Sequence, residues 1–240
     1  MLRSARLIAL PLTALLLGAC VPATGQAMGQ PMAQAPATQT SAATPPPAGN
    51  PLALRHGPPD AARGQRLSAE CSACHGPGGV SSDESIPGLA GQIVPYTQLQ
   101  LAAFRAKLRP SEVMQRVAAK LTDQDIADLS AYFVTQAPGP AWKVDAGARA
   151  RGMKLFTAGD AGRNVIACAI CHGDGGRGVS DHGIASVTNL SPKYGVEVLK
   201  EFRNTPSFGG LIHPEAMRIA VKPLTDADLT DVAAYLASMK

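Results

Sequence analysis

The chain has 240 residues, of which 45% are hydrophobic and only 4% aromatic, and its formal net charge is +4 at pH 7. A chain of this length fits one or two domains. The positive charge is spread along the sequence and forms no basic run or stripe, so we expect no nucleic-acid partner. All but one of the five cysteines lie in two short motifs, which leaves none for a disulfide framework.

The N-terminus resembles a bacterial export signal. A basic start is followed by an apolar run over 7–17, which is shorter than a membrane-spanning helix. The run ends in Leu17-Gly-Ala-Cys20, which is similar to the lipobox of bacterial lipoproteins. We therefore expect a signal peptide over 1–19, lipidation at Cys20, and acyl chains that anchor the protein on the periplasmic side of a membrane. The alternative is ordinary cleavage farther along, which would remove Cys20 and release a soluble protein.

Residues 20–59 are rich in Pro, Ala and Gln, with almost no charge and no apolar periodicity. Such a composition does not bury enough apolar surface to offset the entropy of ordering. We expect a disordered tether that lets the folded part move away from the membrane.

Two segments, 71–75 and 168–172, share the pattern Cys-x-x-Cys-His, which is typical of c-type haem attachment. Two thiols on one helical turn reach two vinyl groups of a porphyrin, and the adjacent His lies beneath the ring as an iron ligand. The alternatives are a zinc site, which needs a second ligand pair, and a redox dithiol, which needs a βαβ pattern. The sequence predicts two covalently bound haem c groups, attached by Cys71, Cys74, Cys168 and Cys171 and ligated by His75 and His172.

The region around these motifs occurs twice. Segment 121–133 matches 224–236, and both are predicted helices with Thr122 or Thr225 as the N-cap and an Asp three residues later as an imperfect capping-box partner. Upstream of them, a helix with Tyr, Leu, Phe and Arg at identical spacing spans 96–105 in the first copy and 194–203 in the second.

Each copy also has a Gly-x-x-Leu segment, 64–67 or 152–155, that we expect to begin a helix leading into the haem motif. No alternating strand pattern is present. The sequence therefore predicts an all-α protein with two tandem domains over 60–138 and 139–240, in which about three to five helices wrap each haem.

A second axial ligand is needed at each iron for electron transfer at fixed coordination. Met114 and Met217 lie at equivalent places before the two Thr-capped helices, and a Met thioether favours ferrous iron. His182 and His213 are the competing candidates in the second copy.

Around each proximal His, a carbonyl is expected to accept a hydrogen bond from the other ring nitrogen. Pro87 is the candidate in the first copy, and Thr188 in the second. Arg105, Arg109 and Arg203 are candidates for pairing with haem propionates, with solvated surface as the alternative.

Several motifs together resemble one family. They are the two Cys-x-x-Cys-His segments, Pro-Gly-Leu-Ala-Gly-Gln over 87–92, the Tyr…Gln-Leu…Phe-Arg helix, and Met followed by Leu-Thr-Asp-x-Asp…Ala-Tyr. Over about residues 60–240 the chain resembles the diheme class I cytochromes c of the cytochrome c4 type. The resemblance implies two cytochrome c folds related by pseudo-twofold symmetry, His/Met ligation at both irons, and periplasmic electron transfer, often to a terminal oxidase. The chain departs from it in a longer loop over 206–214, in the missing Pro of the second copy, and in its lipobox and tether.

Three functions compete. The leading hypothesis is a one-electron carrier, not an enzyme, that passes electrons from a membrane or periplasmic donor to a terminal oxidase or reductase through small transient interfaces. The alternative is the electron-accepting cytochrome subunit of a periplasmic dehydrogenase, which needs a larger and permanent interface. A diheme peroxidase is the third, and methionine candidates in both copies argue against the open iron position that it requires.

Overall fold

The structure is a computed structural model that describes residues 49–204 and 212–240. The predicted signal peptide, Cys20 and the tether up to residue 48 lie outside the described residues, as does 205–211. The described residues belong to one compact unit, 45–240. None of the helices in this described part is long and apolar enough to cross a membrane.

We refer to 60–138 as domain 1 and to 139–240 as domain 2; these bounds remain a prediction. Domain 1 contains α1 (Ala61–Leu67), α2 (Ala69–His75), η1 (Pro77–Gly79), α3 (Val94–Arg105), α4 (Glu112–Ala118) and α5 (Asp123–Phe133). Domain 2 contains α6 (Ala146–Ala158), η2 (Ala161–Arg163), α7 (Ala169–His172), η3 (Ser180–His182), α8 (Pro192–Asn204), α9 (Ile212–Val221) and α10 (Asp226–Ser238). In the described ranges β-structure is limited to two isolated bridges, Asp160–Val165 and Val179–Ile184.

The helices that lead into the two haem motifs begin earlier than predicted. Helix α1 begins at Ala61 because the Asp60 side chain accepts hydrogen bonds from the next N–H groups, and Asp145 caps α6 in the same way. The Gly-x-x-Leu segments therefore lie inside these helices rather than at their starts. The prediction missed both caps because an Asp in a loop has no apolar pattern to mark it.

The predicted tether also ends earlier than residue 59. The N–H groups of Arg55 and Gly57 donate to Asp123 and Gln124 at the start of α5, at 2.8 Å each. Segment 55–58 is therefore held against domain 1 by side chains of α5, which an argument from composition does not consider.

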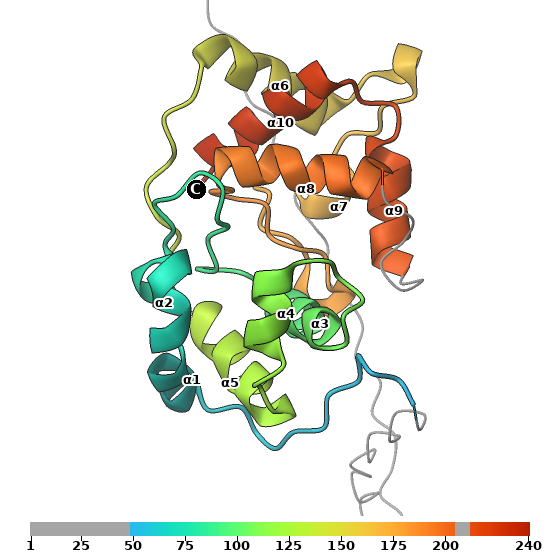
Figure 1. Cartoon of the computed structure of the whole chain (residues 1–240). Coiled ribbons are helices and arrows are strands. Elements are labelled where there is room, and N and C mark those ends of the chain that lie inside the picture. The colour runs from blue at the N-terminus through green and yellow to red at the C-terminus, as the bar shows by residue number, and fades with distance from the viewer. Residues whose placement is uncertain (1–48, 205–211) are drawn as a thin grey trace, which may run out of the picture. The chain divides into compact units, whose positions relative to one another are not determined.

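In each domain the first helix crosses the last at a glycine (Figure 1). A Cβ atom built on Gly64 in α1 would lie 2.0 Å from the Asp128 carbonyl oxygen of α5. The same atom on Gly152 in α6 would lie 1.9 Å from the Asp231 carbonyl oxygen of α10. Only glycine allows the two backbones to approach so closely.

Both predicted capping boxes are present. The hydroxyl of Thr122 or Thr225 accepts from the N–H three residues later, and the Asp there accepts from the cap N–H. The helices that follow bury apolar stripes against the first helix of the same domain: Leu229 and Phe156 are fully buried in domain 2, as is Ile126 in domain 1. These stripes form the two cores.

The two domains contact each other through polar groups of their loops. The Ser191 hydroxyl donates to the Ile86 carbonyl at 2.6 Å, and the Tyr194 N–H donates to the Glu84 carbonyl at 2.9 Å. Gln92 exchanges two hydrogen bonds with the Ser186 backbone. The loop that follows each haem motif therefore lies against the other domain.

Candidate haem sites

In domain 1 the first haem motif forms helix α2, which ends at His75. Gly76 follows with φ 77°, a left-handed conformation that stops the helix. The His75 ring is 8% exposed, and its Nδ1 lies 2.8 Å from the Pro87 carbonyl oxygen, as predicted. This bond leaves Nε2 as the nitrogen available to a metal. Burial lowers the pKa of His75, which keeps the imidazole neutral and able to ligate.

The second motif forms the short helix α7 and ends in the same way at His172. Its Nδ1 lies 2.9 Å from the Ala185 carbonyl oxygen, and burial lowers the pKa of the His172 ring. The carbonyl prediction for domain 2 was therefore wrong, because Ala185 and not Thr188 accepts this bond. Thr188 bonds instead to the Ser186 hydroxyl, at 3.0 Å between the two oxygens.

A signal for the correct partner was present in the sequence. The predicted pairing of Tyr96 with Tyr194 fixes the register of the two copies, and Pro87 precedes the first tyrosine by the same interval as Ala185 precedes the second. Thr188 lies two residues before Leu190, as Pro87 lies two residues before Leu89, but the register set by the tyrosines pairs Pro87 with Ala185 instead. A backbone carbonyl accepts a hydrogen bond whatever its side chain, so the missing Pro does not remove the bond.

The motif thiols differ in exposure. Cys71 and Cys168 are half-buried, whereas Cys74 and Cys171 are exposed. Burial raises the pKa of Cys71, and that of Cys168 to about 11. Both half-buried thiols therefore hold their protons more firmly than an exposed cysteine does.

The predicted sixth ligands lie in short helices rather than in loops. Met114 is in α4 and Met217 in α9, and each helix precedes the Thr-capped helix of its domain. Both methionines are half-buried, and Met217 packs against the domain 2 core. The competing His182 is exposed in η3, a turn that packs against α3 of domain 1. His213 lies in α9, and its side chain is outside the described residues.

The arginines expected at the propionates have protein partners. Arg105 donates to the Leu121 carbonyl at 3.0 Å and Arg203 to the Leu224 carbonyl at 2.9 Å, and each also pairs with the first Asp of the capped helix. The two arginines thus share one role, which fixes the loop before the last helix of each domain.

Arg109 is 7% exposed and reaches the other domain. Its guanidinium donates to Gln100 at 2.7 Å and to the Tyr194 hydroxyl at 3.1 Å, and it lies 3.8 Å from the Glu201 carboxylate. Tyr96 is half-buried beside it, and desolvation raises the pKa of this tyrosine to about 12. The sequence did not reveal this cluster, because it forms only when the two domains meet.

The donor set fits haem c. Each motif presents two free thiols on one helical turn and a buried neutral imidazole whose Nδ1 is already occupied. A zinc site needs further ligands, and nowhere in the described ranges do three or more His, Cys, Asp or Glu side chains gather to hold a metal. When bound, haem c supplies an iron that alternates between ferric and ferrous by one electron. The protein's part is to hold the ring and to tune the imidazole through its carbonyl partner.

Comparison with known proteins agrees with this geometry. The cytochrome c family model matches residues 61–137 and 149–240. Cytochrome c4 from Pseudomonas aeruginosa is 30% identical over 187 residues, which cover 78% of this chain and 92% of the relative. A thiosulfate dehydrogenase electron acceptor from Thiomonas intermedia is 32% identical over 177 residues, which cover 71% and 79%. The crystal structure of reduced recombinant cytochrome c4 from Pseudomonas stutzeri superposes with a TM-score of 0.70 at 28% identity, and the match covers 76% of this chain and 100% of that one.

These matches confirm the predicted all-α class, the tandem arrangement of two cytochrome c domains and haem c as the cofactor. The chain therefore belongs to the cytochrome c family and is a diheme electron carrier of the cytochrome c4 type, with covalently bound haem c in its two domains.

Proposed function

We propose that this chain is a periplasmic carrier in which both haems are ligated by His and Met. Haem 1, in domain 1, is attached to Cys71 and Cys74, with His75 and Met114 on its iron. Haem 2, in domain 2, is attached to Cys168 and Cys171, with His172 and Met217 on its iron. The observation that carries the proposal is the duplication: both domains present the thiol pair, the carbonyl-bonded His, and a half-buried Met in a short helix before the last helix.

The ligand assignment is tested by absorption and magnetic circular dichroism of the ferric holoprotein. We expect two low-spin haems, each with Met–iron charge-transfer intensity. The variants Met114→Ala and Met217→Ala should each lose about half of that intensity, because one thioether is removed from each. Met153→Ala is the matched control, since Met153 is 45% exposed on α6. A Met217→Ala spectrum identical to that of the wild type would contradict the assignment, as would a high-spin haem that binds peroxide.

The donor and acceptor are proposed by chemical class. A membrane or periplasmic donor reduces the haems one electron at a time, and a terminal oxidase or reductase oxidises them. A second candidate is the electron-accepting subunit of a dehydrogenase, which is favoured by the 32% identity to a thiosulfate dehydrogenase electron acceptor. Co-purification and stopped-flow reduction by a thiosulfate dehydrogenase with thiosulfate separate the two. A stable complex with rapid reduction supports the subunit, and slow second-order reduction without a complex supports the free carrier.

The anchor is a separate proposal. The basic start, the apolar run and the Leu-Gly-Ala-Cys20 sequence support export followed by lipidation of Cys20. Mass spectrometry of the mature N-terminus and membrane fractionation of a Cys20→Ser variant test it. A wild-type protein found wholly in the soluble periplasmic fraction would refute the anchor without affecting the haem assignment.

A further inference from the structure

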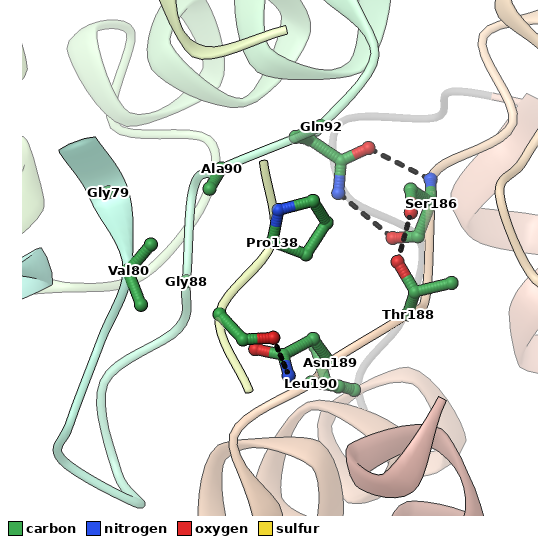
Figure 2. Close-up of a pocket in the computed structure, with 11 residues that line it drawn as sticks. Gly79, Val80, Gly88, Ala90, Gln92, Pro138, Ser186, Thr188, Asn189 and Leu190 are labelled. Carbon is green, nitrogen blue, oxygen red and sulfur yellow. Dashed lines mark hydrogen bonds between the residues drawn. The ribbon is translucent and has the colours of Figure 1, made fainter. Parts of the chain in front are cut away.

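Each proximal histidine donates to a backbone carbonyl, and the two sites differ in whether the N–H of that same peptide group makes a hydrogen bond. In domain 2 the His172 Nδ1–H donates to the Ala185 carbonyl at 2.9 Å. That carbonyl and the Ser186 N–H belong to one peptide group. The same N–H donates to Oε1 of Gln92 in domain 1 at 2.8 Å (Figure 2). A chain of two hydrogen bonds therefore links the imidazole of one domain to a side chain of the other.

Gln92 is fixed in a position to make this bond. Its Nε2 donates to the Ser186 carbonyl at 2.9 Å (Figure 2). Its Oε1 also accepts from the Ile93 N–H at 3.0 Å. The amide thus holds the Ser186 backbone from both sides, in a half-buried place beside a cavity of about 20 Å³. A cavity of this size has room for about one water molecule.

Domain 1 lacks the equivalent arrangement. The Pro87 carbonyl, which accepts from His75, shares its peptide group with the Gly88 N–H. Within the described residues no hydrogen bond is made by the Gly88 N–H. In the register that pairs Tyr96 with Tyr194, Gln92 corresponds to Leu190, which has no amide to offer in return.

We propose that Gln92 of domain 1 is a positioning residue that lowers the reduction potential of haem 2. A peptide whose N–H donates a hydrogen bond carries more negative charge on its oxygen, because bonds in a chain polarise one another. The Ala185 carbonyl then accepts more strongly from His172, and the ligand becomes more basic. A more basic imidazole stabilises ferric over ferrous iron. The inference rests on the proposed ligation by His172, and it adds no step to the transfer of one electron.

The test is a redox titration of the full holoprotein, with each haem followed through the ring signals of its own His by NMR after ¹⁵N-histidine labelling. Gln92→Met keeps the length of the side chain and removes both hydrogen bonds to Ser186, together with the one from the Ile93 N–H. We expect the equilibrium constant for reduction of haem 2 to rise about two- to fivefold, which is about 20–40 mV for one electron. The reduction potential of haem 1 should be unchanged. In the reduced protein the NMR signal of the His172 Nδ1–H proton should move upfield, because its hydrogen bond weakens.

Two further variants keep the test decisive. Gln92→Leu introduces the residue that the second copy carries at this place, and it replaces Gln92→Met if that variant does not fold. Ser191→Ala is the control, because it removes another bond between the domains, to Ile86, without touching the Ala185 peptide. An unchanged haem 2 potential in both Gln92 variants would overturn the proposal. So would an equal shift in Ser191→Ala, since the effect would then come from a loosened interface.

The outcome for Gln92 is separable from that for the ligands. If His172 does not bind iron, its ring signals lack the upfield ring-current shift already in the wild type, and the proposed function fails. If His172 shows that shift and the reduction potential of haem 2 is the same in the wild type and the Gln92 variants, only the inference about Gln92 fails.

Discussion

The crossing of α6 and α10 gives the sharpest prediction about stability. In a Gly152→Ala variant the new Cβ would lie 1.9 Å from the Asp231 carbonyl oxygen and 3.0 Å from the Tyr235 Cβ. Neither backbone atom nor Cβ rotates out of the way, so the helices must separate by about 1 Å or more. That movement loosens the contact between Phe156 and Tyr235, whose ring centroids are 5.3 Å apart. From the usual cost of overpacking and of lost core contacts, we expect the free energy of unfolding to fall by about 2–4 kcal/mol.

The matched control lies in the same helix. Gly147 is exposed, and a Cβ there would lie 3.2 Å from the flexible end of Arg151 and 3.2 Å from the Asp145 Oδ1 that caps the helix. Gly147→Ala should therefore change the stability by less than about 1 kcal/mol, because the gain in helix propensity is offset by a small shift of the cap. Guanidinium unfolding of the holoproteins, followed by far-ultraviolet circular dichroism and by haem absorbance, compares the two. If Gly152→Ala unfolds at the same denaturant concentration as Gly147→Ala, the close crossing does not limit stability and the reasoning fails.

Three further predictions concern the sites and the helix ends. Pro87→Ala should leave the spectrum and potential of haem 1 nearly unchanged, because Ala185 shows that a carbonyl without proline makes the same bond; a large shift in a redox titration would contradict this. Thr225→Ala removes a capping-box hydroxyl and should cost about 1 kcal/mol in denaturant unfolding, whereas an unchanged midpoint would show that the cap is dispensable. The hydrogen bonds from Arg163 hold the pKa of Asp228 at about 2, and in Arg163→Gln this pKa should rise towards 3.8, as titration by NMR would show.

The sign of the pH dependence follows from that lowered pKa. Asp228 binds a proton more weakly in the folded protein than in the unfolded chain, so its pairing stabilises the fold above about pH 4. The contribution declines as the pH falls and is lost near pH 2. Wild type and Arg163→Gln should therefore differ in unfolding midpoint at pH 7 and converge below about pH 2. A difference that grows on acidification would contradict the assignment.

The sequence predicted the features that depend on neighbouring residues. Each haem motif lies in a helix that ends at its buried His, because the two Cys and the His of the pattern lie close together along the chain. Thr122 and Thr225 cap their helices because a cap and its partner lie three residues apart. The duplication of these local patterns identified two domains of one kind, without any knowledge of how they pack.

Features that depend on distant residues were missed or misplaced. The choice between Ala185 and Thr188 depends on how a loop folds back beneath His172, which a one-residue match does not determine. Arg105 and Arg203 were candidates for propionate contact or for solvated surface, and their hydrogen bonds to the carbonyl before the last helix form only after the domain has folded. Segment 55–58 has the composition of a tether and is held by side chains of α5 far along the chain.

The sequence alone determined the cofactor chemistry of this protein, since two copies of Cys-x-x-Cys-His define two sites for haem c. The tertiary structure decided how the two sites differ. Gln92 and Ser186 are 94 residues apart. No residue near either of them in the sequence indicates that a side chain of domain 1 accepts a hydrogen bond from the peptide group whose carbonyl binds His172. Hydrogen bonds within one turn follow from spacing along the chain. Those between domains depend on which surfaces pack together, and that is settled by the whole fold.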